Sequence, residues 1–216
     1  GSNNIFLGRE VASCAVGNDG SNNIAMGYRA AYGITSGDDN LLLGTYSGYC
    51  LTSGLRNINL GYSAGCRAET GNDNVKIGNL AGRCSEGNEN VFIGYNAGTA
   101  HTTGDANVVI GDGGGGVAGS RNVYINNNNT VNLNGDNNFF LGTNAGLCNT
   151  DGDHNNYIGR DAGKCNTTGS CGVFLGRSAG AYSTGTENIH VGVNAGRRGN
   201  GCRNVFIGQY TANSAN

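Results

Sequence analysis

The sequence of 216 residues contains no proline, no tryptophan and one methionine, and only 13% of its residues are charged. The lack of proline, together with the lack of a three-residue glycine period, excludes a collagen-like triple helix. No apolar run approaches the ~20 residues that a membrane-spanning helix needs. The small charged fraction and the formal net charge of −2 exclude a highly charged disordered tail and offer no electrostatic attraction for nucleic acid.

Glycine, by contrast, is abundant, and many of its 41 copies belong to a repeat that covers the whole chain. The repeated motif is Asn, an apolar residue, any residue, an apolar residue and Gly, followed three residues later by a small pair such as Ala-Gly. Residues 90–94 with 97–98 are a clear copy. The closing residue of the motif, called the anchor below, occurs at Gly8, Gly27, Gly44, Gly61, Gly78, Gly94, Gly111, Asn126, Gly142, Gly159, Gly176, Gly192 and Gly208. The Asn four residues upstream is replaced once, by Gly172.

Each motif predicts one short β-strand, because apolar and β-branched residues alternate between Asn and Gly, and no segment has a sustained helical period. Alternate side chains of a strand point to opposite sides. We expect the residues one and three positions before the anchor, such as Ile58 and Leu60, to point into the coil, and the middle residue to point outward. The sequence predicts an all-β fold, a parallel β-solenoid of about 13 coils with a repeat of 16–17 residues.

We assign residues 1–216 to a single solenoid domain. The glycine run 113–116 and the Asn-rich segment 126–129 are interpreted as a bulge or an altered coil within that domain. Stacked Asn side chains can hydrogen-bond from coil to coil, and the anchor glycine permits a positive φ or a close backbone approach. These structural roles are expected for Asn40, Asn57, Asn74, Asn90, Asn107, Gly44, Gly61, Gly78, Gly94 and Gly111.

The middle strand position carries a largely aromatic series, which stacked coils would align into an exposed apolar stripe. Such a stripe usually marks an interface, so we predict that chains pack together through it. The alternatives are a surface ladder that only aids stacking, or a face covered by loops of the same chain. Asn59, Lys76 and His190 interrupt the stripe. The interface candidates are Phe6, Phe92, Tyr124, Phe140, Tyr157, Phe174 and Phe206.

Eight cysteines indicate an oxidising environment, with buried thiols in a reducing compartment as the alternative. Cys148 and Cys165 take the same turn position in consecutive coils, where a separation of ~5 Å suits a disulfide. Cys66 is placed to pair with either Cys50 or Cys84. There is no Cys-x-x-Cys pair and the three histidines are scattered, so we expect neither a metal site nor a cofactor.

Acidic residues such as Asp73 and Asp105 recur in the turn before the Asn, where Asx-type turns are favoured over calcium binding. No catalytic set stands apart from the repeat, so we expect no enzyme. Recurrent Ser/Thr pairs, such as residues 35–36 and 52–53, suggest ice binding as the alternative function, although Glu69, Glu86 and Asp151 break the series. Asn128 and Asn166 lie in N-glycosylation sequons.

The unit Asn-Val-Phe-Ile-Gly-x-x-Ala-Gly at residues 90–98 resembles the head repeats of trimeric autotransporter adhesins and the Asn/Gly-rich repeats of phage and large-virus tail fibres. The resemblance covers essentially the whole chain, although the adhesin-head repeat is usually shorter. It implies a left-handed parallel β-roll, three chains side by side, and a role in attachment or as a spacer. The chain opens within the pattern, since residues 1–4 recur as residues 20–23, and we interpret it as a segment of a longer fibre.

From these observations we predict a structural or adhesive segment of an extracellular, cell-surface or virion-surface fibre. The expected partners are further copies of the chain, as a homotrimer or an end-to-end filament, and a surface glycan or protein receptor. Nucleic acid and membrane insertion are not expected. A fibre-borne polysaccharide hydrolase is the third interpretation, after ice binding.

Overall fold

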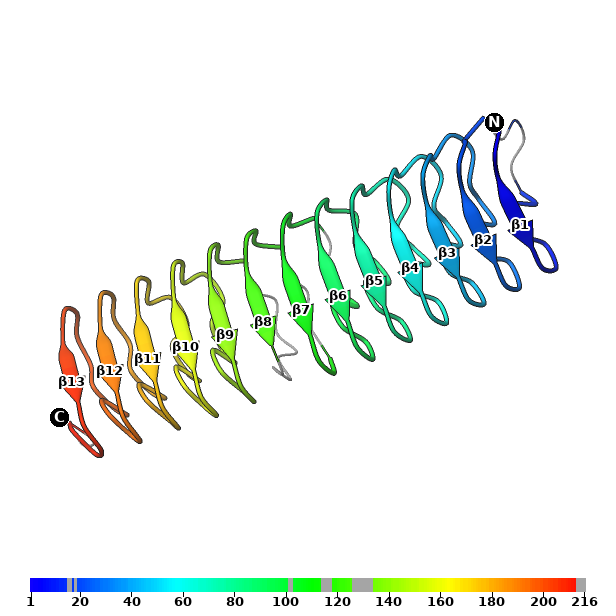
Figure 1. Ribbon diagram of the computed structural model, residues 1–216. Helices are drawn as coiled ribbons and strands as arrows, with labels where there is room; N and C mark the ends of the chain where they lie inside the picture. Colours follow the sequence, from blue (N-terminus) through cyan, green and yellow to red (C-terminus); the bar gives the residue numbers. More distant parts are fainter. Residues whose placement is uncertain (15–16, 18, 101–102, 114–117, 126–133, 213–216) are drawn as a thin grey trace. The chain divides into compact units, whose positions relative to one another are not determined.

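The computed structural model describes residues 1–14, 17, 19–100, 103–113, 118–125 and 134–212 (Figure 1). It forms a parallel β-solenoid with one three-residue strand in each coil, which confirms the predicted fold class. In the part of the chain that is described, no helix is long and apolar enough to cross a membrane.

The chain divides into two compact units, residues 1–113 and residues 114–216. The first unit contains β1 (Ile5–Leu7), β2 (Ile24–Met26), β3 (Leu41–Leu43), β4 (Ile58–Leu60), β5 (Val75–Ile77), β6 (Val91–Ile93) and β7 (Val108–Ile110). The second contains β8 (Val123–Ile125), β9 (Phe139–Leu141), β10 (Asn156–Ile158), β11 (Val173–Leu175), β12 (Ile189–Val191) and β13 (Val205–Ile207). The division falls in the glycine run 113–116, and the single-domain interpretation stays a prediction. The aberrant anchor Asn126 lies outside the described residues.

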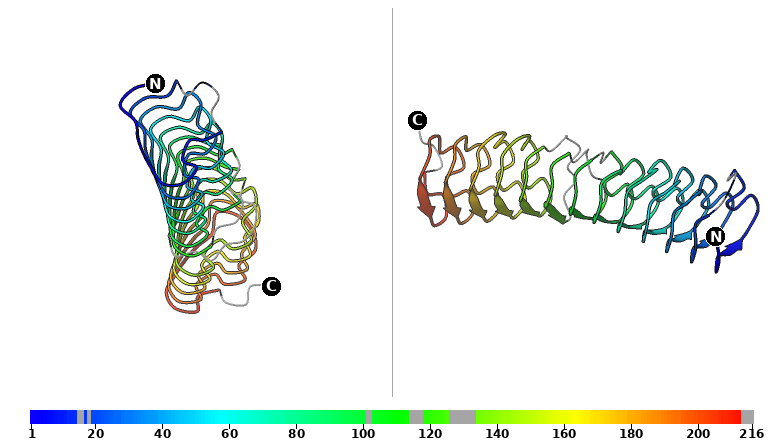
Figure 2. Two further views of the ribbon diagram at one scale, coloured as in Figure 1. Left: turned by 90° about the vertical axis from the view of Figure 1, so that its right-hand side faces the viewer. Right: turned by 90° about the horizontal axis from the view of Figure 1, so that it is seen from above.

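Within each unit, neighbouring strands pair in chain order and in register, so equivalent residues of successive coils lie side by side. Ile58 is paired with Val75, for example, and Tyr157 with Phe174. Figure 2 shows the strands of each unit along one side of the coils and the turns along the other. The small-residue segment after the anchor makes turns. Its coils are still tied together, as where the N–H of Gly48 donates to the carbonyl oxygen of Ala64 at 2.9 Å.

The expected direction of the strand side chains is wrong. The middle residue of each strand points into the coil, and the first and third residues point outward. Phe92, Phe140, Tyr157 and Phe174 are fully buried, whereas the outer residues of their strands are half-buried or exposed. The interface candidates therefore form an interior column: Phe92, Tyr124, Phe140, Tyr157 and Phe174 are buried, Phe206 is half-buried on the last strand, and Phe6 is 37% exposed on the first.

The reason for this direction is the thinness of the coil. The residue four positions after the anchor faces the middle strand residue from the turn side, and it is glycine in most described coils. A Cβ atom at Gly180 would lie 2.7 Å from the ring of Phe174, so the interior accommodates one large side chain and nothing opposite it. Where the strand contributes the small Ala25, the turn side contributes Ala31 and Ile34 to the same core. Large and small residues thus complement one another across each coil.

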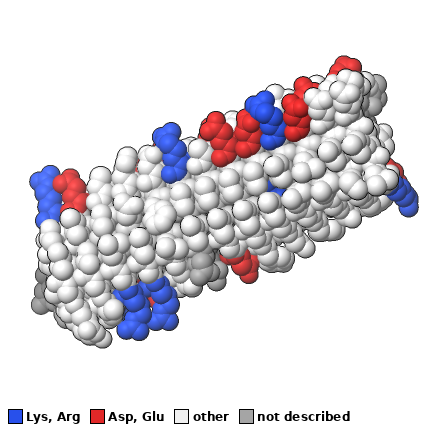
Figure 3. All heavy atoms as spheres, viewed as in Figure 1, with Lys and Arg blue, Asp and Glu red and all other residues white. Residues whose placement is uncertain are grey.

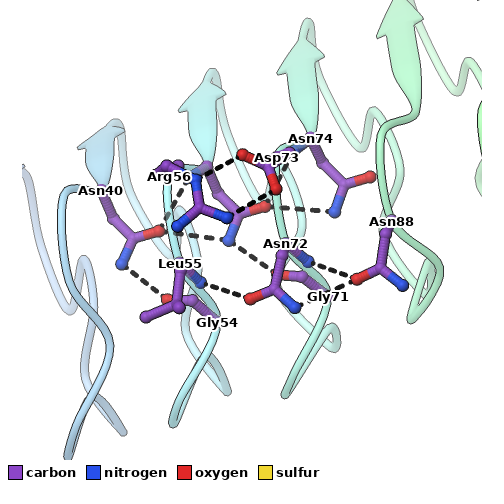
Figure 4. Close-up of polar contacts among 10 residues, drawn as sticks. Asn40, Gly54, Leu55, Arg56, Gly71, Asn72, Asp73, Asn74 and Asn88 are labelled. Carbon is purple, nitrogen blue, oxygen red and sulfur yellow. Dashed lines mark hydrogen bonds and ion pairs between the residues drawn. The ribbon is translucent and has the colours of Figure 1, made fainter.

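The Asn column makes the hydrogen bonds that were expected of it (Figure 4). Asn40 accepts a bond at Oδ1 from the N–H of Asn57, one coil on, at 2.9 Å, and its Nδ2 donates to the carbonyl oxygen of Gly54 at 2.8 Å. The same two bonds recur at the Asn of other coils in both units. Each Asn amide therefore satisfies two buried backbone groups that no strand bond reaches.

The anchor glycines have both properties that were expected of them. Gly44 has φ of 129°, and a Cβ atom there would lie 2.5 Å from the carbonyl oxygen of Gly61. An L-residue disfavours this conformation, and the next coil leaves no space for its side chain. The close stacking of coils at this corner thus depends on glycine.

Candidate interaction surfaces

The first and third residues of the strands form two outward columns in each unit, which we call the outer strand face. Its residues are Val, Ile, Leu, Met and Phe, with Asn156 as the polar exception. None of these positions carries a charge, and in Figure 3 the charged side chains of both units gather along the margins of the strand side. The outer strand face is therefore a regular, uncharged and apolar surface.

The size of the outer strand face follows from the strand spacing. Seven strands at ~4.8 Å give the first unit a strip roughly 30 Å long, and two side-chain columns give it a width of roughly 12 Å. The resulting area is on the order of 350 Å² per unit, which is in the range of the largest apolar patches on soluble proteins. Within the sheet, Met26, Ile110, Ile158 and Ile189 remain more than a third exposed.

A second surface consists of aromatic and basic residues on the turns after β1 to β4, in the first unit. The members of this tyrosine–arginine cluster are Arg9, Glu10, Tyr28, Arg29, Tyr32, Tyr46, Tyr49 and Tyr62. Tyr32 and Tyr49 stack with their ring centroids 4.9 Å apart. Tyr46 meets Tyr28 and Tyr49 edge to face, at 5.5 and 5.6 Å. All five tyrosines keep part of their rings accessible, and Tyr62 is 52% exposed.

The charges of the cluster are arranged around Glu10. Both Arg9 and Arg29 form ion pairs with its carboxylate. The bond from Arg29 holds the pKa of Glu10 below its usual value, and the same bond raises the pKa of Arg29. The guanidinium of Arg29 also lies over the rings of Tyr28 and Tyr32, at 5.1 and 5.5 Å, so it connects the aromatic and charged parts of the cluster.

The acidic turn residues bind across neighbouring coils, whereas the Asx-type turns that were expected are bonds to the residue's own backbone two positions on. The carboxylates of Asp105 and Asp136 accept bonds from the backbone N–H groups of Asn88 and Ser120, both at 2.7 Å. Asp73 forms a bidentate pair with Arg56 at 2.6 and 2.8 Å (Figure 4). Among the described residues, no group of three His, Cys, Asp or Glu side chains is placed to hold a metal ion.

All eight cysteines are free thiols in the structure. Cys148 and Cys165 lie at equivalent turn positions of consecutive coils, as predicted; burial, and secondarily the neighbouring Cys148, raise the pKa of the Cys165 thiol. Cys50 and Cys66 are also neighbours, since the N–H of Cys50 donates to the carbonyl oxygen of Cys66 at 3.0 Å. Cys84 lies one coil further along.

The Ser/Thr series and the sequons have structural contacts. The hydroxyls of Thr35 and Thr52 donate to carbonyl oxygens of the next coil at 3.1 and 3.0 Å, so they already have partners within the protein. Asn166 is buried, and its Nδ2 donates to the hydroxyl of Tyr157 at 2.9 Å. A glycan cannot reach this nitrogen in the folded chain, so Asn166 is wrong as a glycosylation candidate. Asn128 lies outside the described residues.

Two basic side chains, Lys76 and His190, occupy the interior column. Burial lowers the pKa of Lys76 to about 8, and its Nζ donates to the carbonyl oxygen of Ser85 at 3.2 Å. Burial lowers the pKa of His190 to about 4, and neither ring nitrogen has a hydrogen-bond partner within the described part of the chain. His190 is stacked between Phe174 and Phe206 and serves as a neutral aromatic ring.

Neither the outer strand face nor the tyrosine–arginine cluster was predicted from the sequence. A signal for the cluster was present, since five of the ten tyrosines fall between residues 28 and 62. Searches of protein families, of curated proteins and of solved structures return no match to this chain.

Proposed function

We propose that the protein is a rigid, non-catalytic segment of an extracellular or virion-surface fibre, in which copies of the chain pack side by side through the outer strand face. The observation that carries this proposal is the outer strand face itself. It is uncharged and regular along each unit, and it is apolar in every described coil except at Asn156.

Side-by-side packing is favoured by the area of this face. Each unit offers on the order of 350 Å² to a second copy, so an assembly that uses the faces of both units would approach the ~800 Å² per partner of a stable protein interface. Burial of apolar area at ~25 cal/mol per Å² is the driving force for such packing. Three chains, as in the proteins that the repeat resembles, would bury the outer strand face of each unit against one another.

Rigidity is favoured by the double connection between coils. Strand pairing joins the backbones, and the Asn amides join the corners with two further bonds per coil. Bending the solenoid would stretch both sets at once, so the segment is suited to act as a spacer. An attachment role would add weak contacts on exposed turns, multiplied by the number of copies.

The mass in solution tests this proposal. We expect light scattering to give a multiple of the 22.0 kDa chain, with three copies as the favoured number. The double change Ile77→Glu and Ile93→Glu places two carboxylates on the outer strand face and should dissociate the assembly while the circular dichroism spectrum stays unchanged. The change Thr52→Glu, on the turn side, is the matched control. A monomeric wild-type protein would overturn the side-by-side proposal.

Within the proposed extracellular setting, we also propose a disulfide between Cys148 and Cys165. Its formation releases two protons and two electrons and therefore requires a thiol oxidant in that compartment. Alkylation followed by mass spectrometry should find six free thiols after mild oxidation if this pair alone reacts, and eight under reducing conditions. Eight free thiols after oxidation would exclude the disulfide.

A further inference from the structure

We propose that the tyrosine–arginine cluster binds an acidic polysaccharide, with tyrosine rings against the sugar rings and Arg9 paired with a sugar carboxylate. This inference adds a ligand class to the attachment half of the proposed function. It does not depend on side-by-side packing, because the cluster lies on the turns and the outer strand face lies on the strands.

The solenoid does not require aromatic residues at these turn positions. Tyr28 and Tyr62 directly follow an anchor glycine, where other coils have Thr45, Asn79 or Thr143. Those coils close with the same backbone bonds between turns. The tyrosines are therefore additions to the repeat, and they are concentrated in adjacent coils of one unit.

The arrangement of the rings favours a sugar chain over a compact ligand. In-register coils place Tyr32 and Tyr49 in a stack that follows the coil spacing, and Tyr46 connects this stack edgewise to Tyr62 on the next coil. The result is an extended row of phenol rings with hydroxyl groups at their tips. Sugar rings have an apolar C–H face and a rim of hydroxyls, which match the face and the tip of tyrosine.

The charge of the cluster favours an acidic sugar. Two guanidinium groups against one carboxylate leave a net charge of +1. Arg29 is two-thirds buried between Glu10 and two rings, so its role is to hold the cluster together. The side chain of Arg9 is 80% exposed and contacts Glu10 through Nε, which leaves the far edge of its planar guanidinium open to a carboxylate in water.

The test is affinity for polygalacturonate, with neutral dextran of the same length as the comparison, measured by calorimetry on the full chain. We expect binding to polygalacturonate and at least tenfold weaker binding to dextran. Arg9→Gln should reduce the affinity for polygalacturonate at least tenfold, to the level of dextran, and so remove the preference for the acidic polymer. Tyr62→Ala should weaken binding to polygalacturonate at least fivefold.

Tyr95→Ala is the matched control, because Tyr95 is a tyrosine of the same unit that is 55% exposed and stands outside the cluster. Its affinity should stay within twofold of wild type. Tyr46→Phe removes one hydroxyl and keeps the ring contacts. A weaker affinity of this variant for polygalacturonate would therefore show that the hydroxyl contributes to binding, independently of the packing of the cluster. The proposal is overturned if the wild-type protein fails to bind polygalacturonate or binds dextran with equal affinity. It is also overturned if the cluster binds a surface protein and not the polymer.

The outer-face variant Ile77→Glu with Ile93→Glu separates this inference from the fibre proposal. If the chains pack and the cluster binds sugar, the monomeric variant should keep the affinity of a single site and lose only the gain from several copies. If the packing proposal fails but the cluster binds sugar, the wild type and the variant should both be monomers and bind polygalacturonate equally. If the sugar inference fails, the assembly mass stays unchanged and polygalacturonate has no effect on either protein.

Discussion

The two units differ in where most of their aromatic residues lie, which is inside the coils in the second unit and on the turns in the first. In the second unit the interior column is a continuous ring stack through Tyr124, Phe140, Tyr157, Phe174, His190 and Phe206, with centroids 4.6–5.3 Å apart. In the first unit the same column contains Phe6, Ala25, Leu42, Asn59, Lys76, Phe92 and Val109. Its tyrosines lie outside, on the turns.

This difference shows that the coil is defined by its backbone bonds, glycines and Asn amides, and that the inward residue is free to vary if the turn side adapts to it. Tyr157 has Gly163 opposite its ring and Asn166 at its hydroxyl. Lys76 has Gly82 beside its chain and the carbonyl of Ser85 at its amine. These two inward residues are thus matched within their own coils.

Among these substitutions, the greatest loss of stability is expected when the ring stack of the second unit is interrupted. Phe174→Ala removes a fully buried ring and two stacking partners, so we expect a loss of about 3–5 kcal/mol in unfolding free energy. Hydrogen exchange followed by mass spectrometry should show faster exchange in residues 139–209 and little change in residues 24–100. Equal acceleration in both units would contradict independent interiors.

Acid should weaken the second unit more than the first. His190 has a pKa of about 4 when folded and 6.5 as its ordinary value, so below pH 6.5 the unfolded state binds the extra proton. Stability should therefore fall as the pH drops from 6.5 to 4, by ~3 kcal/mol. The change His190→Phe keeps a ring in the stack and should remove this fall, as measured by denaturation at a series of pH values. A wild-type protein with the same pH profile as His190→Phe would refute the assignment.

Alkali should strengthen the first unit through Lys76. Its pKa is about 8 when folded and 10.5 as the ordinary value, so between these values the unfolded state binds more protons. The contribution of Lys76 should rise by up to ~3 kcal/mol as the pH increases from 8 to 10.5. Thiols and phenols also ionise in this range, so the measurement is the difference in unfolding free energy between wild type and Lys76→Met. A difference that is constant with pH would contradict the prediction.

The smallest effect is expected from a substitution that restores Asn at the one interrupted position of the Asn column. Gly172 lies where other coils have Asn, and its φ is not in the left-handed region. A Cβ atom at this position would lie 3.0 Å from Oδ1 of Asn155 and 3.2 Å from the ring of Tyr157, a cost that Gly172→Asn and Gly172→Ala share. Since only the Asn adds the missing bonds, Gly172→Asn should exceed Gly172→Ala by about 1 kcal/mol in unfolding free energy. Gly172→Ala, which adds a Cβ without an amide, is the control. The amide has no role at this position if both variants melt at the same temperature.

The fold class could be predicted from the sequence, because the strand, the anchor glycine and the Asn recur at the same positions of successive repeats. The inward and outward sides were assigned in reverse for a physical reason. The outer positions, which are apolar except for Asn156, look like a core, while Asn59 and Lys76 make the middle position look exposed. The thin coil reverses this, since it has space for one inward side chain per strand, and the two outer columns form a shared surface instead.

The amino-acid sequence by itself determined where each strand begins and ends, which residues join the coils and where glycine is indispensable, since these depend on local backbone geometry repeated along the chain. Only the tertiary structure decided which strand face is buried and which side chains gather on the surface. Stacking places Tyr32 against Tyr49 and Tyr46 against Tyr62, although a full coil of sequence separates each pair. Closure of the coil against its glycines selects the buried face. Both the stacking between coils and this closure depend on residues that are far apart in the sequence or on opposite sides of the coil, so a single strand motif does not show them.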